Sequence, residues 1–346
     1  MCIRDSLKGI IGTVTGGSYS AGIGGGQSSE SEVHISGGTI DKVSGGERGA
    51  GIGSGYIGGS STVNISGDAE LKDVTGGEYA AGIGSGHGSG KVDVVIDGGT
   101  IKATGGDSAA GIGSGHNSRS SVTIKSGTVN AAGNKHSSDG SSGIGGNYTD
   151  VTISGGTITA AGGDGAAGIG GGYYNGATVT ITGDAVIKNA STTVYGAGIG
   201  GGNGSDGNVT ISGNAKIENA TGGYGAAGIG GGAFSSPDKI GNGNVVIKDN
   251  AKIDNVQGGA YGAGIGGGIY GLSNVTIEGN TKVNATGGAG GAAIGGGAGA
   301  ENNSDNNGNQ ITIKSNENGS PTINAVGGGT DEGEEIVIGG AGIGAG

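Results

Sequence analysis

The sequence predicts an all-β fold, a parallel β-solenoid of about ten coils of roughly 30 residues with three short strands in each coil. A hexapeptide close to Ala-Gly-Ile-Gly-Gly-Gly recurs eleven times, and most gaps between its isoleucines are 25 to 32 residues. Between successive copies lie two short segments in which apolar and polar residues alternate, separated by glycine pairs. Because a unit of this length buries its apolar face only against its neighbours, the units must stack.

Residues 151–172 contain one complete unit, whose segment one is Val151-Thr152-Ile153-Ser154. Successive side chains of a strand point to opposite faces, so we expect Val151 and Ile153 to point inward. The same inward pair recurs as Val33/Ile35, Val63/Ile65, Val94/Ile96, Val122/Ile124, Val179/Ile181, Val209/Ile211, Val245/Ile247, Val275/Ile277 and Ile311/Ile313. These pairs predict the first face of the solenoid.

Segment two is Thr157-Ile158-Thr159-Ala160, which follows the Gly155-Gly156 corner and points Ile158 inward. Its equivalents are Ile40, Leu71, Ile101, Val129, Ile187, Ile217, Ile253, Val283 and Ile323. Glycine at such corners supplies positive φ without steric cost. The glycine pairs therefore predict turns between the three segments.

Segment three is the hexapeptide, with Ala167 and Ile169 pointing inward in the reference unit. Its isoleucines are Ile23, Ile52, Ile83, Ile112, Ile144, Ile169, Ile199, Ile229, Ile265, Ile294 and Ile343. Since glycine alternates with isoleucine here, this face has no outward side chains. We expect a smooth strip of exposed backbone that runs along the whole rod.

Composition agrees with this prediction. Glycine supplies 95 of 346 residues but does not fall at every third position, and two prolines are too few for collagen. Glycine costs about 1 kcal/mol per helical position relative to alanine, so almost no helix is expected. The regular Val and Ile positions argue against a disordered Gly/Ser tract. Right-handed winding is expected, because parallel crossovers are overwhelmingly right-handed.

Charge and apolar content bear on the partners. The formal net charge is −12 and arginine occurs three times, which argues against a nucleic-acid partner. No apolar run reaches the roughly 18 residues of a membrane span, so membrane insertion is not expected. One cysteine, Cys2, cannot form an internal disulfide framework. The Asn-, Thr-, Ser- and Gly-rich composition is typical of exported bacterial repeat proteins.

Residues 1–7 match no part of the repeat, whereas residues 8–346 read as a single β-solenoid domain. The repeat is entered and left partway, so we interpret the chain as a fragment of a longer array, with its export signal and anchor elsewhere. A short protein with ragged ends is the alternative. Insertions at 233–243, 300–309, 315–320 and 329–335 are expected to protrude from the turns.

Aromatic residues gather on both sides of segment three. Each of the ten tyrosines lies within five residues of a segment-three isoleucine, and two histidines take equivalent places. Stacked coils would align these rings into two broken ladders beside the glycine strip, a surface suited to the C–H faces of a linear polysaccharide. The candidate carbohydrate-binding residues are Tyr19, Tyr56, Tyr79, His87, His116, Tyr148, Tyr173, Tyr195, Tyr224 and Tyr261. The simpler interpretation is that the rings cover turns and staple adjacent coils.

Other patterns support narrower hypotheses. An outward threonine column (Thr123, Thr152, Thr180, Thr210, Thr276, Thr312) resembles an ice-binding surface, but its neighbouring column is mixed. Residues 201–206 match the start of a calcium-binding nonapeptide only once and with the wrong period, and the acidic run at 331–335 fits a solvated loop. The many Gly-x-Gly-x-x-Gly matches lack the helix that a nucleotide site needs. We therefore expect no metal and no cofactor.

The units Gly155-Gly156-Thr157-Ile158-Thr159-Ala160-Ala161-Gly162-Gly163 and Ala167-Gly168-Ile169-Gly170-Gly171-Gly172 resemble glycine-rich repeats of large, adhesin-like surface proteins from anaerobic gut-type bacteria. More distantly they resemble pectate-lyase-type right-handed β-helices, some of which are non-catalytic carbohydrate-binding modules. The resemblance implies an extracellular setting and an adhesive or scaffold role. It carries over no family site motif.

We thus expect a non-catalytic structural and adhesive segment, a stalk that contacts an extracellular polysaccharide along the tyrosine-edged strip. One alternative is a fibre or spacer without a ligand, which associates end to end through unpaired strand edges. An ice-binding protein and a polysaccharide-active enzyme are further alternatives. Catalysis has little support, because the sequence holds no Cys/His pair, zinc spacing or Ser/His/Asp context.

Overall fold

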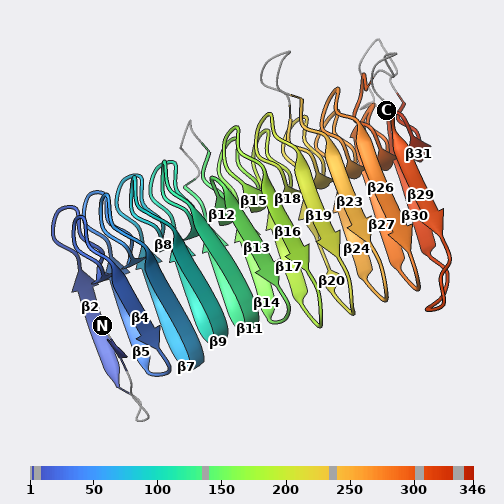
Figure 1. Ribbon diagram of the computed structural model, residues 1–346. Helices are drawn as coiled ribbons and strands as arrows, with labels where there is room; N and C mark the ends of the chain where they lie inside the picture. Colours follow the sequence, from blue (N-terminus) through green and yellow to red (C-terminus); the bar gives the residue numbers. More distant parts are fainter. Residues whose placement is uncertain (1, 4–8, 135–139, 234–239, 301–307, 330–338) are drawn as a thin grey trace.

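The predicted parallel β-solenoid is confirmed. The computed structural model describes residues 2–3, 9–134, 140–233, 240–300, 308–329 and 339–346, and these contain strands and turns but no helix. Figure 1 shows the coils stacked side by side in one elongated row, with the two termini at opposite ends. Every pairing between named strands is parallel, and the ladders form a 20-stranded and an 11-stranded sheet.

Segments one and two build the 20-stranded sheet. Segment one comprises β1 (Cys2–Ile3), β4 (Ser31–Ile35), β13 (Thr149–Ile153), β16 (Ala177–Ile181), β19 (Gly207–Ile211), β23 (Gly243–Ile247), β26 (Ser273–Glu278) and β29 (Gln310–Lys314). Segment two comprises β2 (Ile10–Thr15), β5 (Thr39–Ser44), β14 (Thr157–Ala161), β17 (Val186–Ser191), β20 (Lys216–Ile217), β21 (Ala220–Thr221), β24 (Lys252–Gln257), β27 (Lys282–Ala289) and β30 (Thr322–Gly328). In three coils one bent strand spans both segments: β7 (Ser61–Thr75), β9 (Val92–Thr104) and β11 (Ser120–Ala132).

Segment three builds the 11-stranded sheet from very short strands. These are β3 (Ile23–Gly24), β6 (Ile52–Gly53), β8 (Ile83–Gly84), β10 (Ile112–Gly113), β12 (Ile144–Gly146), β15 (Ile169–Gly171), β18 (Ile199–Gly200), β22 (Ile229–Gly230), β25 (Ile265–Gly266), β28 (Ile294–Gly295) and β31 (Ile343–Gly344). Isoleucine pairs with isoleucine at each step of this sheet, from Ile23 with Ile52 to Ile294 with Ile343. The predicted isoleucine column is therefore confirmed.

One continuous core fills the solenoid. Val33, Ile35, Ile40 and their equivalents up to Val275, Ile277 and Val283 are almost fully buried and form a single cluster with the segment-three isoleucines from Ile23 to Ile294. In the last coil Ile313 and Ile343 are 41% and 47% exposed. Each aliphatic layer lies between the layers of the neighbouring coils, so the hydrophobic effect stabilises the stack and not the single coil.

Segment two contributes a second inward column that the sequence analysis did not assign. It runs through Val43, Val74, Ala103, Ala131, Ala160, Ala190, Ala220, Val256, Ala285 and Ala325. Glycines of segment three lie directly across the interior, and a Cβ on Gly22 or Gly51 would press on the Val43 or Val74 side chain. Gly22 and Gly51, each directly before a segment-three isoleucine, therefore make room for the opposite wall.

The expected strip of exposed glycine backbone is wrong. In the second to the tenth copy the hexapeptide is buried, as from Ala50 to Gly55, except for the half-buried Asn147 that ends the fifth copy. The chain on either side of the Ile-Gly strand folds over it and is held there by hydrogen bonds between neighbouring coils. In each such bond, the N–H of the residue four positions after a segment-three isoleucine donates to a carbonyl oxygen of the preceding coil. That carbonyl belongs to the residue four positions before the isoleucine of the preceding coil. Examples are Tyr56 N to Tyr19 O at 2.8 Å and His116 N to Tyr79 O at 2.9 Å. These bonds satisfy loop backbone groups that would otherwise lack partners.

The ends and insertions differ in how far the structure describes them. Of residues 1–7, β1 is described, and it pairs Ile3 with Ile35 of β4, so the ladder reaches into the segment left outside the repeat. Residues 315–320 close a small turn, in which Asn316 and Gly319 exchange backbone hydrogen bonds of 2.9 and 3.1 Å. Pro237, most of the insertion at 300–309 and the acidic run at 331–335 lie outside the described residues.

Candidate functional site

The rings of the first coils form one interlocked group, here called the N-terminal ring cluster: Tyr19, Tyr56, Tyr79, His87 and His116. Their centroids lie 5.3 Å apart for Tyr19 and Tyr56, 5.5 Å for Tyr56 and His87, and 5.5 Å for Tyr79 and His87. His116 lies 5.6 Å from Tyr79 and 5.3 Å from His87. The two ladders predicted on separate sides of a strip thus meet above the buried hexapeptide.

The later coils carry a different arrangement, here called the C-terminal ring row: Tyr195, Tyr224 and Tyr261. Tyr224 lies 6.2 Å from Tyr195 and 5.6 Å from Tyr261, with both pairs edge to face. Tyr195 is 39% and Tyr224 is 52% exposed, while Tyr261 is half-buried, as are all five rings of the N-terminal cluster. Burial, followed by the neighbouring Tyr261 and Tyr195, raises the pKa of Tyr224, so its hydroxyl keeps its proton.

The remaining candidate rings lie outside both groups. Tyr148 is 67% exposed, and the Arg119 guanidinium lies over its ring at 5.4 Å. Tyr173 stacks on Tyr174 at 4.2 Å, with a 3.3 Å hydrogen bond between their hydroxyls. The structure therefore brings together eight of the ten predicted residues in two groups.

Several tyrosines occupy backbone positions that favour glycine. Tyr19, Tyr79, Tyr195 and Tyr261 lie four residues before a segment-three isoleucine and have φ between 63° and 70°. Other coils place glycine at the same position with a similar φ, namely Gly140, Gly165, Gly225 and Gly290. The left-handed region costs a residue with a side chain about 1–2 kcal/mol. The tyrosine rings must therefore contribute contacts that offset this cost, or serve a function.

A cationic corner lies beside the N-terminal ring cluster. The Arg48 guanidinium lies over the Tyr56 ring at 5.2 Å, and the Arg48 carbonyl accepts the His87 N–H at 3.1 Å. Burial, followed by the neighbouring His116 and Arg48, lowers the pKa of His87, while Glu78 opposes this shift. His87 Nδ1, His116 Nδ1 and Arg48 Nε are buried without a hydrogen-bond partner among the described residues. The sequence analysis did not predict the positions of Arg48 and Arg119, because nothing in the repeat pattern places an arginine over a tyrosine ring.

Amide side chains form ladders along the other faces. Asn280 donates to Asn250 at 3.2 Å, Asn250 to Asn214 at 3.3 Å, and Asn214 to Asp184 at 3.0 Å. A second ladder begins where Asn244 donates to Asn208 at 3.0 Å. Such coil-to-coil bonds are modest contributions, typically about 1 kcal/mol each, and they hold neighbouring corners in register.

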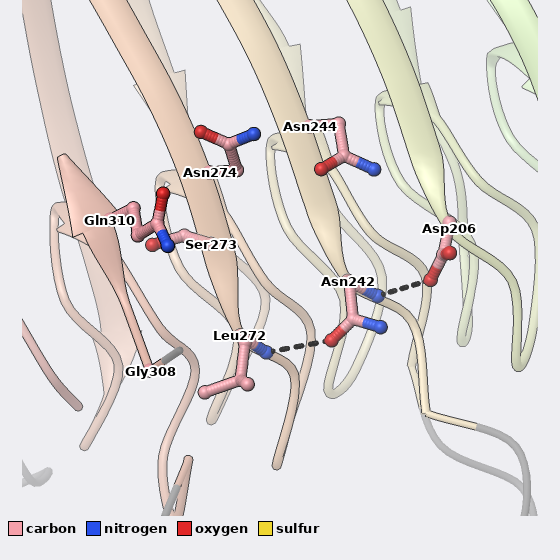
Figure 2. A pocket seen from close by; sticks show the side chains of 8 residues that line it. All are labelled: Asp206, Asn242, Asn244, Leu272, Ser273, Asn274, Gly308 and Gln310. Atoms are coloured by element: carbon pink, nitrogen blue, oxygen red, sulfur yellow. Dashed lines mark hydrogen bonds between the residues drawn. The ribbon is translucent and has the colours of Figure 1, made fainter. Parts of the chain in front are cut away.

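The second ladder leads into a polar hollow of about 250 Å³ on the later coils. Figure 2 shows Asn244 and Asn274 on neighbouring strands, Gln310 on the next strand, and Asp206, Asn242 and Leu272 near the strand starts. The Asn242 N–H donates to Asp206 Oδ1 at 2.8 Å, and the Leu272 N–H donates to Asn242 Oδ1 at 3.0 Å. The sequence analysis considered Asp206 only for calcium. In four successive coils, an Asn or Gln directly precedes the first inward residue of segment one. This regular amide position is the sequence signal that could have indicated the hollow.

Charged side chains mostly form surface ion pairs between neighbouring coils. Lys72 pairs with Asp41 at 2.9 Å, and Lys216 pairs with Asp254 at 2.9 Å. The threonine column is in register, as shown by Thr123 beside Thr152 and Thr180 beside Thr210. Among the described residues, no group of three or more His, Cys, Asp or Glu side chains could hold a metal ion. The described part of the chain also has no helix long and apolar enough to cross a membrane.

A family model described as a beta helix repeat matches residues 33–56, 94–116, 122–148, 151–173, 209–233 and 275–298. The chain contains β-helix repeats. With the stacked parallel coils, this match supports the predicted right-handed β-helix repeat region. Each matched β-helix repeat starts at the first inward valine of segment one and ends four residues after a segment-three isoleucine. Neither the curated proteins nor the solved structures include a significant match.

Proposed function

We propose that this β-helix region is a non-catalytic structural and adhesive segment of an extracellular bacterial surface protein. Its unbroken ladders and single core make it suited to act as a stiff rod, because bending would open both sheets at once. The Asn-, Thr- and Ser-rich surface and the resemblance to adhesin-like repeats support the extracellular setting. Carboxylates such as Asp41 and Asp254 form ion pairs with lysines of neighbouring coils, which supports a structural role for these charged side chains.

The adhesive part of the proposal places an extended polysaccharide on the C-terminal ring row. In the N-terminal cluster, the cost of the left-handed backbone at Tyr19 and Tyr79 is offset by ring contacts, each worth about 0.5–1.5 kcal/mol. Tyr195 lies in the same kind of backbone position with φ of 63°, yet among the described residues its one ring contact is edge to face at 6.2 Å, and it stays 39% exposed. This exposed tyrosine in an unfavourable backbone position is the observation that carries the proposal.

The test removes the rings without disturbing the backbone. Tyr195→Gly and Tyr261→Gly introduce the residue that other coils use at this position, and Tyr224→Ala completes the triple variant. We expect the native chain to be retained by at least one insoluble or gel-embedded polysaccharide and the triple variant to lose that retention. Tyr148→Gly is the matched control, since it removes an exposed tyrosine with φ of 48° outside the row.

Retention by no polysaccharide, or equal retention of native chain and triple variant, would refute glycan contact at this row. A spacer function, which needs only the stacked coils, would then be the better description. The ice-binding alternative draws less support from the geometry, because the column beside the threonines mixes Asp93, Ser121 and Asp150 with amides in the later coils.

A further inference from the structure

We propose that the polar hollow at the starts of β23, β26 and β29, with Asp206 at its edge, is a separate subsite for one neutral sugar residue. This inference adds a second contact to the proposed adhesive function, and its evidence is independent of the rings. It begins from an interrupted ladder. Asn208, Asn244, Asn274 and Gln310 are paired in register on four successive strands.

The amide ladder stops inside the hollow. Asn244 donates to Asn208 at 3.0 Å, but in the described part of the chain the Asn274 and Gln310 side chains make no hydrogen bond. The asparagine ladder at the opposite corner shows that coils at this spacing can close such bonds, through Asn250 and Asn280 at 3.2 Å. Two neighbouring exposed amides therefore keep their donors and acceptors available to a ligand.

The lining suits a hydroxyl-rich, uncharged ring. Amides both donate and accept, and the exposed Asp206 carboxylate accepts, so together they match the mixed donors and acceptors of sugar hydroxyls. Leu272 supplies an apolar wall for the C–H face of a ring. Among the described residues that line the hollow there is no lysine or arginine, and Asp206 repels carboxylates and sulfates. These features favour a neutral sugar over an acidic one.

The size of the hollow fits a single residue of a longer polymer. Its volume of about 250 Å³ lies below the roughly 300–1,000 Å³ of pockets for drug-sized ligands. The strands that supply the amides are about 4.8 Å apart, so a chain lying along the rod meets one amide per coil. The hollow thus fixes one sugar while the polymer continues along the surface.

The experiment measures binding of short neutral oligosaccharides to the whole chain. Saturation-transfer NMR and calorimetric titration would use tetrasaccharides of β-1,4-linked glucose, xylose and mannose, with tetragalacturonate as the charged comparison. We expect one neutral tetrasaccharide to bind. Asn274→Ala and Gln310→Ala should each weaken it about fivefold, the usual effect of one lost hydrogen bond. Asn130→Ala, which removes an exposed amide from β11, should leave the affinity unchanged.

The ring triple variant separates this proposal from the previous one. If it keeps the tetrasaccharide affinity but loses retention by long polymers, both sites exist. If it loses retention while the native chain binds no tetrasaccharide, the ring row stands and the hollow proposal fails. Binding that is unchanged in the Asn274→Ala/Gln310→Ala double variant, or binding of tetragalacturonate alone, would also overturn the proposal. Because Asn274 and Gln310 are exposed, an unchanged thermal unfolding curve will exclude misfolding as the cause.

Discussion

The N-terminal ring cluster and the C-terminal ring row use equivalent positions of the repeat but differ in what lies opposite each ring. The carbonyl of Tyr19 accepts the N–H of Tyr56 and that of Tyr79 accepts the N–H of His116, so ring faces ring. The carbonyl of Tyr195 accepts the N–H of Ala233, and that of Tyr261 accepts the N–H of Ala298. The same backbone loop therefore sets a ring opposite the tyrosine in one half and an alanine in the other, where Tyr195 is exposed and Tyr261 is half-buried.

The structural role of a ring and its availability to a ligand therefore depend on the residue opposite it. A ring that another ring covers stabilises the stack, whereas a ring opposite alanine adds little to stability and presents a surface. The residue four positions after the isoleucine thus decides the role of the tyrosine in the coil before.

Both halves rest on the same buried Ile-Gly strand, and breaking it should produce the largest effect. Gly84 lies beneath the N-terminal cluster and Gly200 beneath the C-terminal row, each with φ of 135°. An added Cβ would overlap the carbonyl oxygen of Gly113 or Gly230 in the next coil. We expect Gly84→Ala and Gly200→Ala each to lower the free energy of unfolding by about 4 kcal/mol or more, measured by denaturant unfolding.

Gly12→Ala is the control for these variants, because an added Cβ there meets no atom within 4 Å. Its unfolding curve should match that of the native chain. Equal stability of Gly84→Ala and Gly12→Ala would show that the coils do not approach as closely as the structure indicates.

The two halves should respond differently when a left-handed tyrosine becomes glycine. Tyr79→Gly loses ring contacts to His87 and His116, worth about 0.5–1.5 kcal/mol each, while it relieves about 1–2 kcal/mol of backbone strain. With the loss of buried ring area, we expect a net destabilisation of about 1 kcal/mol. Tyr195→Gly loses a single edge contact, so its unfolding free energy should change by less than about 0.5 kcal/mol. A larger loss at Tyr195 than at Tyr79 would contradict the comparison.

The sequence predicted the scaffold well because a few residue types determine it. Val and Ile at alternate positions specify the inward faces, and isoleucine at a constant place in each coil specifies the register, as with Ile112 beside Ile144. The burial of the hexapeptide could not be predicted in the same way. Alternating glycine carries no side chain that reports which side is covered, and the covering bonds, such as Tyr56 N to Tyr19 O, join loop backbones of different coils.

The candidate site was predicted only as a set of residues. Tyr19, Tyr79 and Tyr195 each lie four residues before a segment-three isoleucine, and this constant spacing predicted that they occupy equivalent positions in their coils. Whether a ring is covered depends on the partner in the next coil, for example Tyr56 or Ala233, and on the loop closure that aligns them. The amide hollow depends on Asn274 remaining outside a ladder, which the residue type alone does not reveal.

Acid should weaken the N-terminal half and spare the C-terminal row, which contains no imidazole. The pKa of His87 is lowered from 6.5, first by burial and then by His116 and Arg48, against the attraction of Glu78. The contribution of His87 is therefore complete above about pH 6.5 and is lost as the pH falls from there to the lowered folded value. Between about pH 7 and pH 5, amide protection factors, which are corrected for the pH dependence of intrinsic exchange, should fall in the coils around Tyr79 more than around Tyr224.

His87→Gln separates this effect from the titration of carboxylates, because glutamine stays neutral throughout. Its melting temperature should fall less than that of the native chain over the same pH interval. An identical decrease in both proteins would assign the acid sensitivity to other groups.

The smallest expected effect comes from converting one half into the other. Ala298 is half-buried and lies opposite Tyr261, as Tyr56 lies opposite Tyr19. Ala298→Tyr should place a ring against Tyr261 and raise the free energy of unfolding by about 0.5–1 kcal/mol, the usual value of an aromatic pair. Polysaccharide retention should decrease at the same time, because the new ring covers part of the row. A gain in stability without any loss of retention would show that coverage by the opposite loop does not control access to the rings.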